Sequence, residues 1–153
     1  MLNDSSASAI RAEVTEERLF LDVSVLLAAA LEPASPSHQC VDMSDTGTIV
    51  VSEHVESMAR QVLLRNAPDL LPVFNDGLLR LASRSNLERV GTSPRTLLPS
   101  WASRLSGEDQ QVLADALGSD ASILLTHDAA FFQGPANDMA VLSPASYVWR
   151  AMG

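Results

Sequence analysis

Short apolar runs alternate with stretches of helical periodicity along most of this chain. The runs RLFLDVS at 18–24, TIVV at 48–51 and SILLT at 122–126 are predicted as buried strands, because each is rich in Leu, Ile or Val. Weaker strand candidates lie at 87–90 and 139–142. Strands that alternate with helices predict an α/β fold, with a three-layer α/β/α arrangement around a mostly parallel central sheet.

Helical spacing fills most of the intervals between these strands. The predicted helices are 25–32, 53–64, 68–84 with a break near Gly77, 108–117, and a last one that opens at Pro144. We expect Ser52 to cap the second helix and Gly118 to end the fourth. Pro, Ser and Asp dominate 33–46, which is predicted as a loop, and the pattern assigns no structure to 91–100.

Length and charge limit the classes of function. The chain has 153 residues, enough for one domain, which we expect at 18–153 after a tail or short helix at 1–17. Its net charge is −9, which argues against broad binding to a nucleic-acid backbone, since that needs a basic face. A small nuclease site stays open, because a metal ion can carry the local positive charge. The chain has no Lys, so a Walker-type phosphate loop and Schiff-base chemistry are excluded.

Targeting signals are missing from the sequence. No apolar run approaches the ~20 residues of a membrane span, and the first twenty residues lack the basic start and apolar centre of a signal peptide. Cys40 is the only cysteine, so the chain has neither a disulfide framework nor a cysteine metal cluster. We therefore expect a cytoplasmic protein with no membrane partner.

Three aspartates fall where a parallel sheet would bring them together. Asp22 lies at the carboxyl end of the first strand, Asp128 just past SILLT, and Asp109 in the first turn of the helix that leads into SILLT. Parallel sheets place ligand sites at the carboxyl ends of their strands, and several carboxylates can hold Mg²⁺ or Mn²⁺. Helix capping by Asp109 and a turn at Asp128 are alternative readings. Asp22 is harder to explain structurally, because a carboxylate in an apolar strand is costly to bury.

The chain resembles the PIN domain family over roughly residues 18–150, with a poor fit between 66 and 105. LFLDVSVLLAAAL resembles the family's opening strand and helix, IVVSEHVESMARQVLLR the second pair, EDQQVLADALGSDASILLTHDAAFF the run that ends in Thr-x-Asp, and VLSPASYV the close. The resemblance implies that Asp22, Asp109 and Asp128 are catalytic metal ligands, supported by Ser24 and Thr126. It also implies cleavage of single-stranded RNA with Mg²⁺ or Mn²⁺, often as the toxin of a bacterial toxin–antitoxin pair, with an antitoxin partner and a homodimer.

One position departs from the family pattern. The family usually has a Glu in the second helix where this chain has Met58, and a thioether does not usefully ligate a hard cation. Glu53 and Glu56 lie nearby but face elsewhere on the helix if Met58 faces the site. His54, one turn before Met58, is either an exposed residue at the helix start, which is the favoured reading, or a residue that reaches the edge of the site.

Other side chains near the expected site have less specific roles. His127 is either a loop residue or a base, and Arg60, Arg95 and Arg104 either contact phosphate or are simply solvated. The main alternative to a nuclease is a catalytically degenerate PIN-like module that binds protein or RNA. A phosphatase of the haloacid dehalogenase type is disfavoured, because it needs a second Asp where Ser24 stands and a Lys.

Overall fold

The computed structural model describes residues 17–44 and 47–152. The predicted tail or helix at 1–17 therefore lies outside the described residues, apart from Glu17. Within the described ranges, no helix is long and apolar enough to cross a membrane.

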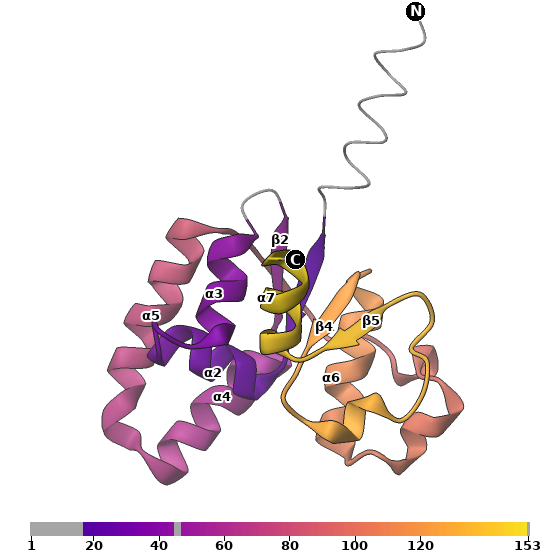
Figure 1. Cartoon of the computed structure of the whole chain (residues 1–153). Helices are drawn as coiled ribbons and strands as arrows, with labels where there is room; N and C mark the ends of the chain where they lie inside the picture. Colours follow the sequence, from indigo (N-terminus) through magenta and orange to yellow (C-terminus); the bar gives the residue numbers. More distant parts are fainter. Residues whose placement is uncertain (1–16, 45–46, 153) are drawn as a thin grey trace, which may run out of the picture.

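A five-stranded parallel sheet forms the centre of the molecule (Figure 1). Its strand order is β3-β2-β1-β4-β5, and every neighbouring pair is parallel. The strands are β1 (Arg18–Leu21), β2 (Thr48–Ser52), β3 (Asn86–Val90), β4 (Ile123–Leu125) and β5 (Ala140–Leu142). This sheet confirms the predicted α/β class and all five strand candidates, including the two weaker ones.

Six α-helices in the described ranges surround the sheet, as the three-layer prediction requires. They are α2 (Val23–Leu31), α3 (Pro36–Met43), α4 (Glu53–Asn66), α5 (Leu71–Arg84), α6 (Gly107–Gly118) and α7 (Pro144–Met152). Helix α2 packs against α3, α4 and α5, and α3 packs against α7. Helix α4 also contacts α6, so these two helices meet near the carboxyl ends of the strands.

The central strand β1 explains why the apolar runs are continuous rather than alternating. Leu19, Phe20 and Leu21 are all fully buried, because helices cover both faces of the sheet. The edge strand β3 differs, since most of its side chains are exposed and only Leu87 and Val90 are half-buried. Burial thus follows the position of each strand in the sheet.

The loop predicted at 33–46 is wrong, because most of it is helix α3. The Ser35 side chain caps this helix by accepting a hydrogen bond from the His38 amide at 3.2 Å, and Pro36 occupies its first position. Cys40 and Val41 are buried. The Ser-Pro pair that suggested a break is instead a helix start.

Two further boundaries differ from the predictions. The first strand ends at Leu21 rather than Ser24, since Asp22 already caps α2. Helix α5 continues through Gly77 without a break, and a Cβ atom there would lie 2.0 Å from the Ala30 carbonyl oxygen. Gly77 therefore allows a close approach of α5 to α2 and does not interrupt the helix. The unassigned stretch at 91–100 holds one 3₁₀ helix, Arg95–Leu97, and a second one, Ser100–Arg104, begins at its end.

Candidate active site

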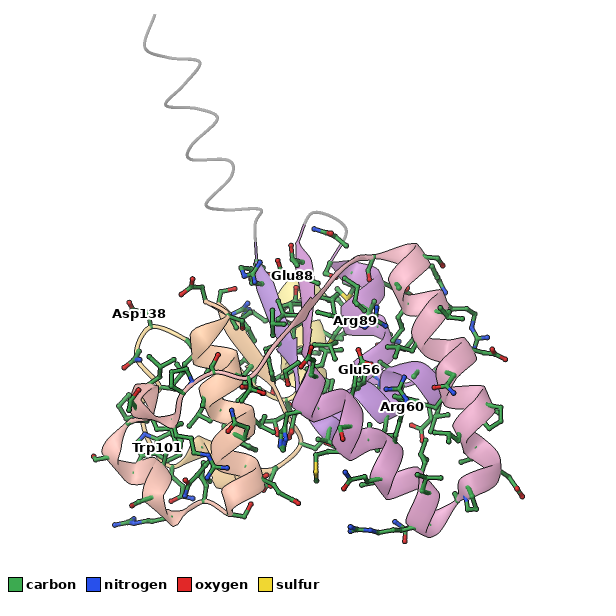
Figure 2. The ribbon with its side chains drawn as sticks, turned by 180° about the vertical axis from the view of Figure 1, so that it is seen from behind. Glu56, Arg60, Glu88, Arg89, Trp101 and Asp138 are labelled. Atoms are coloured by element: carbon green, nitrogen blue, oxygen red, sulfur yellow. The ribbon has the colours of Figure 1, made fainter. Side chains whose placement is uncertain are left out.

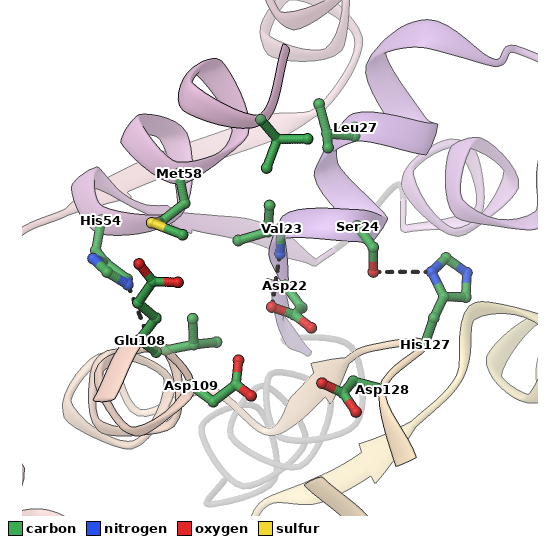
Figure 3. A pocket seen from close by; sticks show the side chains of 12 residues that line it. Asp22, Val23, Ser24, Leu27, His54, Met58, Glu108, Asp109, His127 and Asp128 are labelled. Atoms are coloured by element: carbon green, nitrogen blue, oxygen red, sulfur yellow. Dashed lines mark hydrogen bonds between the residues drawn. The ribbon is translucent and has the colours of Figure 1, made fainter. Parts of the chain in front are cut away.

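A cavity of about 390 Å³ opens at the carboxyl edge of the sheet, between α2, α4, α6 and the loop after β4 (Figure 3). The strand order reverses direction between β1 and β4, and such a reversal is where parallel sheets usually bind ligands. The lining residues come from four segments: Asp22, Val23, Ser24, Leu27, His54, Met58, Val62, Glu108, Asp109, Val112, His127 and Asp128. The cavity therefore brings together all three aspartates chosen from the sequence.

Asp22 is the most enclosed acid of the cavity, with 6% of its surface exposed. Its Oδ1 accepts a hydrogen bond from the Val23 amide at 2.7 Å, which caps α2, and its Oδ2 accepts one from Thr126 Oγ1 at 2.6 Å. Burial raises the pKa of Asp22; the Thr126 and Val23 hydrogen bonds lower it, and the charges of Asp109 and Asp128 raise it further. The carboxylate is thus fixed in place and unfavourable in its charged form.

Asp109 lies in the first turn of α6 and is half-buried. Ser106, not Asp109, caps this helix, because its hydroxyl accepts a hydrogen bond from the Asp109 amide at 3.1 Å. Burial raises the pKa of Asp109, and so do the charges of Asp128 and Glu108, whereas a hydrogen bond with Ser106 lowers it. The capping explanation for this acid is therefore not needed.

Asp128 is exposed at the mouth of the cavity. Its Oδ1 accepts a hydrogen bond from the Ala130 amide at 2.9 Å, so it is also a turn residue. Its own amide donates to Thr126 Oγ1 at 3.0 Å, and the same hydroxyl donates to Asp22. The fully buried Thr126 therefore links the two acids that follow β1 and β4.

Two histidines stand on opposite sides of the cavity (Figure 3). His127 Nδ1 lies 3.1 Å from Ser24 Oγ, and His54 Nε2 lies 3.3 Å from the carbonyl oxygen of Glu108. The second contact joins the first turn of α4 to the first turn of α6. The structure thus places Ser24, His54 and His127 at the rim of the cavity, each held by one neighbour.

Met58 faces the cavity, and the acids nearest to it on α4 do not. Glu53 and Glu56 line a separate groove on another side of this helix. There the Glu56 carboxylate pairs with Arg60 at 3.0 Å and with Arg89 at 2.5 Å (Figure 2). The expectation that these glutamates point elsewhere agrees with this arrangement.

The three arginines considered as phosphate contacts do not line the cavity. Arg60 pairs with Glu56, and its guanidinium lies 5.6 Å from the centre of the Phe74 ring. Arg95 donates to the Gly107 carbonyl at 2.8 Å and to Gln111 at 3.2 Å, so it braces the start of α6. Arg104 is exposed outside the cavity. Among the lining residues, only the two histidines are able to become cations.

Glu108 and the apolar side of the cavity were not among the predicted site residues. Glu108 precedes Asp109 and lies one helical turn before Val112, which also lines the cavity. This spacing places Glu108 and Val112 on the same face of the helix, so the sequence could have indicated that Glu108 also lines the cavity. Val23, Leu27 and Val62 meet only because α2 packs on α4, and the sequence carries no local sign of that contact.

The donor chemistry of the cavity suits a hard divalent cation, since its acids offer carboxylate oxygens and its outer acid is open to water. In the part of the chain that the structure describes, however, no three His, Cys, Asp or Glu side chains form a group that could hold a metal ion as they stand. Mg²⁺ often binds through one or two carboxylates and keeps several waters. An ion at this site would therefore have to be held partly through water.

Solved structures with a similar fold include two that match along most of the chain. The first is VapBC2 from Rickettsia felis, crystallised with a DNA fragment from its promoter, with a TM-score of 0.62 and 14% identity over 81% of this chain and 96% of the other. The fold is PIN-like. The second is a domain of a functionally unknown protein from Methanocaldococcus jannaschii. Its fold is similar to that of this chain with a TM-score of 0.54 and 18% identity, over 83% of this chain and 90% of the other. No protein-family model and no curated protein sequence matches.

Proposed function

We propose that this chain is a metal-dependent endonuclease of the PIN type that cleaves single-stranded RNA in the cytoplasm. The observation that carries the proposal is the convergence of Asp22, Asp109 and Asp128 from three different segments on one cavity at the carboxyl edge of the sheet. Burial raises the pKa of Asp22, and repulsion from the charges of Asp109 and Asp128 raises it further. A bound divalent cation would relieve this repulsion.

Asp22, Asp109 and Asp128 would hold the ion, directly or through water. When bound, Mg²⁺ or Mn²⁺ supplies Lewis-acid stabilisation of a phosphodiester and lowers the pKa of a bound water. Asp22 provides a fixed oxygen, because Thr126 and the Val23 amide restrain both oxygens of its carboxylate. Asp128 is exposed and provides the side on which water and substrate enter.

The rim of the cavity offers groups that can orient a phosphate or a water. Ser24 and His127 form one such pair, and His54 lies on the opposite wall. Because none of the described arginines lines the cavity, phosphate binding depends on the ion and on these hydroxyl and imidazole groups. This local arrangement is compatible with a net charge of −9, since the ion alone brings two positive charges to the site.

The substrate we propose is single-stranded, because the bases of an unpaired strand can splay away from one another and enter a small cavity. A cavity of about 390 Å³ is too small to admit a base-paired duplex. RNA as the substrate rests on the resemblance to PIN ribonucleases.

We also propose an antitoxin protein as the partner of this chain, since VapBC2 is a PIN-domain toxin–antitoxin complex. The homodimer stays a prediction. Trp149 and Met152 on α7 are 81% and 74% exposed and suit such an interface, whereas Tyr147 on the same helix is buried.

A catalytically degenerate PIN-like module is the second candidate. Two observations favour it: Met58 faces the acids, and the described side chains do not form a closed metal site as they stand. Such a module would keep the fold and bind a protein or an RNA without cutting it.

The test of the proposed function is cleavage of single-stranded RNA by the purified full chain with Mn²⁺. The matched variants are Asp128→Asn in the cavity and Asp76→Asn on α5, where the carboxylate is exposed and does not line the cavity. We expect the wild type and Asp76→Asn to cleave equally and Asp128→Asn to lose cleavage. A wild type that binds RNA but never cleaves it would support the degenerate module instead.

A further inference from the structure

The cavity has two chemically unlike sides. Its acids come from the ends of β1 and β4 and from α6, whereas Leu27 on α2 with Met58 and Val62 on α4 form an apolar wall. Figure 3 shows Met58, Val23 and Leu27 together on one side, across from Asp109 and Asp128. The two sides belong to one continuous space of about 390 Å³.

The apolar wall is not part of the closed core. Leu27, Met58 and Val62 are only half-buried, whereas Val55 and Ala59 on the core-facing side of α4 are fully buried. Half-exposed apolar side chains that line a cavity leave apolar surface in water, which is unfavourable unless a ligand covers it. Contact with a flat apolar partner would remove this surface from water and is therefore favourable.

We propose that this apolar wall of Leu27, Met58 and Val62 is a subsite for one nucleobase of the RNA strand. The inference rests on the proposed function, because a nucleotide is the unit that carries an anionic phosphate and a flat π-face a short distance apart. The phosphate faces the acids and their ion, and the base lies against the wall. The unbranched, polarisable side chain of Met58 adapts to the face of a ring.

His54 marks the border between the two sides. Its ring is half-buried, and its Nε2 is held 3.3 Å from the carbonyl oxygen of Glu108. The ring is therefore positioned beside Met58, one helical turn away, where it limits how far a base can extend. Because every base has a π-face, contact with this wall tolerates different bases and favours no particular sequence.

A peptide is the competing occupant of the same wall. An apolar side chain of a protein partner would also cover Met58, but it would leave the acids of the cavity without a counter-charge. A nucleotide, together with its ion, satisfies both sides of the cavity at once. The contact is therefore assigned to RNA, and the peptide becomes an outcome of the test.

The experiment measures cleavage kinetics of the full chain with Mn²⁺ on a set of single-stranded RNAs that carry one abasic site at successive positions. The wild type should show a KM raised about tenfold by an abasic site at one position, with kcat little changed, since a stacked base contributes about that factor to affinity. Met58→Ala should raise the KM for intact RNA by a similar factor and lose its sensitivity to that abasic site. Met58→Leu should restore most of the affinity.

Two controls separate the outcomes. Leu64→Ala removes a 57% exposed apolar side chain from α4 outside this cavity and should leave the kinetics unchanged. The affinity for Mn²⁺, measured by calorimetry, should be the same in the wild type and Met58→Ala. If Met58→Ala keeps the full sensitivity to the abasic site, the subsite is overturned while the nuclease stands.

Other results overturn the subsite in different ways. Unchanged RNA kinetics in Met58→Ala together with weaker binding of an antitoxin would assign the wall to a protein partner. A wild type that binds Mn²⁺ but cleaves none of the RNAs would overturn the proposed function, and the subsite with it.

Discussion

Two groups of charged side chains lie on different sides of helix α4, and they differ in whether their carboxylates have cationic partners. On one side, Glu56 lies between Arg60 and Arg89, and both guanidinium groups pair with its carboxylate. On the other side, Asp22, Asp109 and Asp128 share a cavity that no arginine lines. Cationic partners favour the charged form of a carboxylate, whereas burial and the charges of neighbouring acids disfavour the charged form of Asp22. The first group is explained by structure alone, whereas the second has no such cationic partners among the described arginines.

The largest effect should come from Asp22→Asn. Asn keeps the side-chain oxygen that can cap α2, but it removes the fixed negative charge beside Asp109 and Asp128. We expect kcat for RNA cleavage to fall by roughly a thousandfold, as for the loss of a central electrostatic group in an active site. Glu56→Gln, measured in the same assay, should retain activity within a small factor. Equal losses in the two variants would erase the distinction between the two groups.

A second effect should come from Met58→Glu, which adds a carboxylate to the wall that faces the acids. We expect the affinity for Mn²⁺ to rise about tenfold, because one more carboxylate oxygen becomes available to the ion. Ser57→Glu is the matched control, since Ser57 lines the groove of Glu56 instead. Calorimetry that finds no gain for Met58→Glu, or the same gain for both, would show that Met58 does not face the ion.

Thermal stability should separate the two groups without any assay of activity. The folded-state pKa of Asp22 lies above its ordinary value of 3.8, mainly through burial. The contribution of Asp22 to the free energy of unfolding is therefore fully present below pH 3.8, its ordinary pKa. This contribution is lost as the pH rises through the folded-state pKa. At neutral pH and without metal, Asp22→Asn should raise Tm by a few degrees.

Glu56→Gln should have the opposite sign. It removes the partner of Arg60 and Arg89, and we expect a loss of about 1 kcal/mol, as for a pair that is partly exposed. Denaturation of both variants at pH 7 in a chelating buffer checks the two signs together. A lower Tm for Asp22→Asn would mean that its carboxylate is structurally favourable after all.

The smallest effect should come from Ser24→Ala. The Ser24 hydroxyl is the partner of His127 Nδ1 at 3.1 Å, and both side chains are exposed. Loss of this one hydrogen bond should reduce kcat/KM by about fivefold, equivalent to ~1 kcal/mol, without changing Tm. A change in Tm instead of kcat/KM would make Ser24 a residue of structure rather than of the site.

Some of this arrangement follows from the sequence and some does not. Parallel strands end at one edge of their sheet, so the positions of Asp22 and Asp128 after two apolar runs were enough to predict that they converge. Helix α3 was missed because Ser35 and Pro36 fit either a loop or a helix start, and burial of Cys40 decides between them. That burial depends on α7, more than a hundred residues away in the chain.

The contacts that shape the cavity also join distant residues. Ser24 and His127, like Asp22 and Thr126, come from the ends of two strands that are adjacent in space only. Val62 reaches the cavity because α4 packs on α2. No local pattern encodes such packing, so the apolar wall could not be predicted while the acids could.

Calorimetric titration with Mn²⁺ tests the central claim most directly, because it asks whether the cavity holds an ion without requiring a substrate. The samples are the wild type, Asp22→Asn, Asp109→Asn, Asp128→Asn and the control Asp76→Asn. The account predicts one binding site in the wild type and in Asp76→Asn, weakened at least tenfold in each of the three cavity variants. No binding by the wild type at millimolar Mn²⁺, or equal binding by all five proteins, would contradict it.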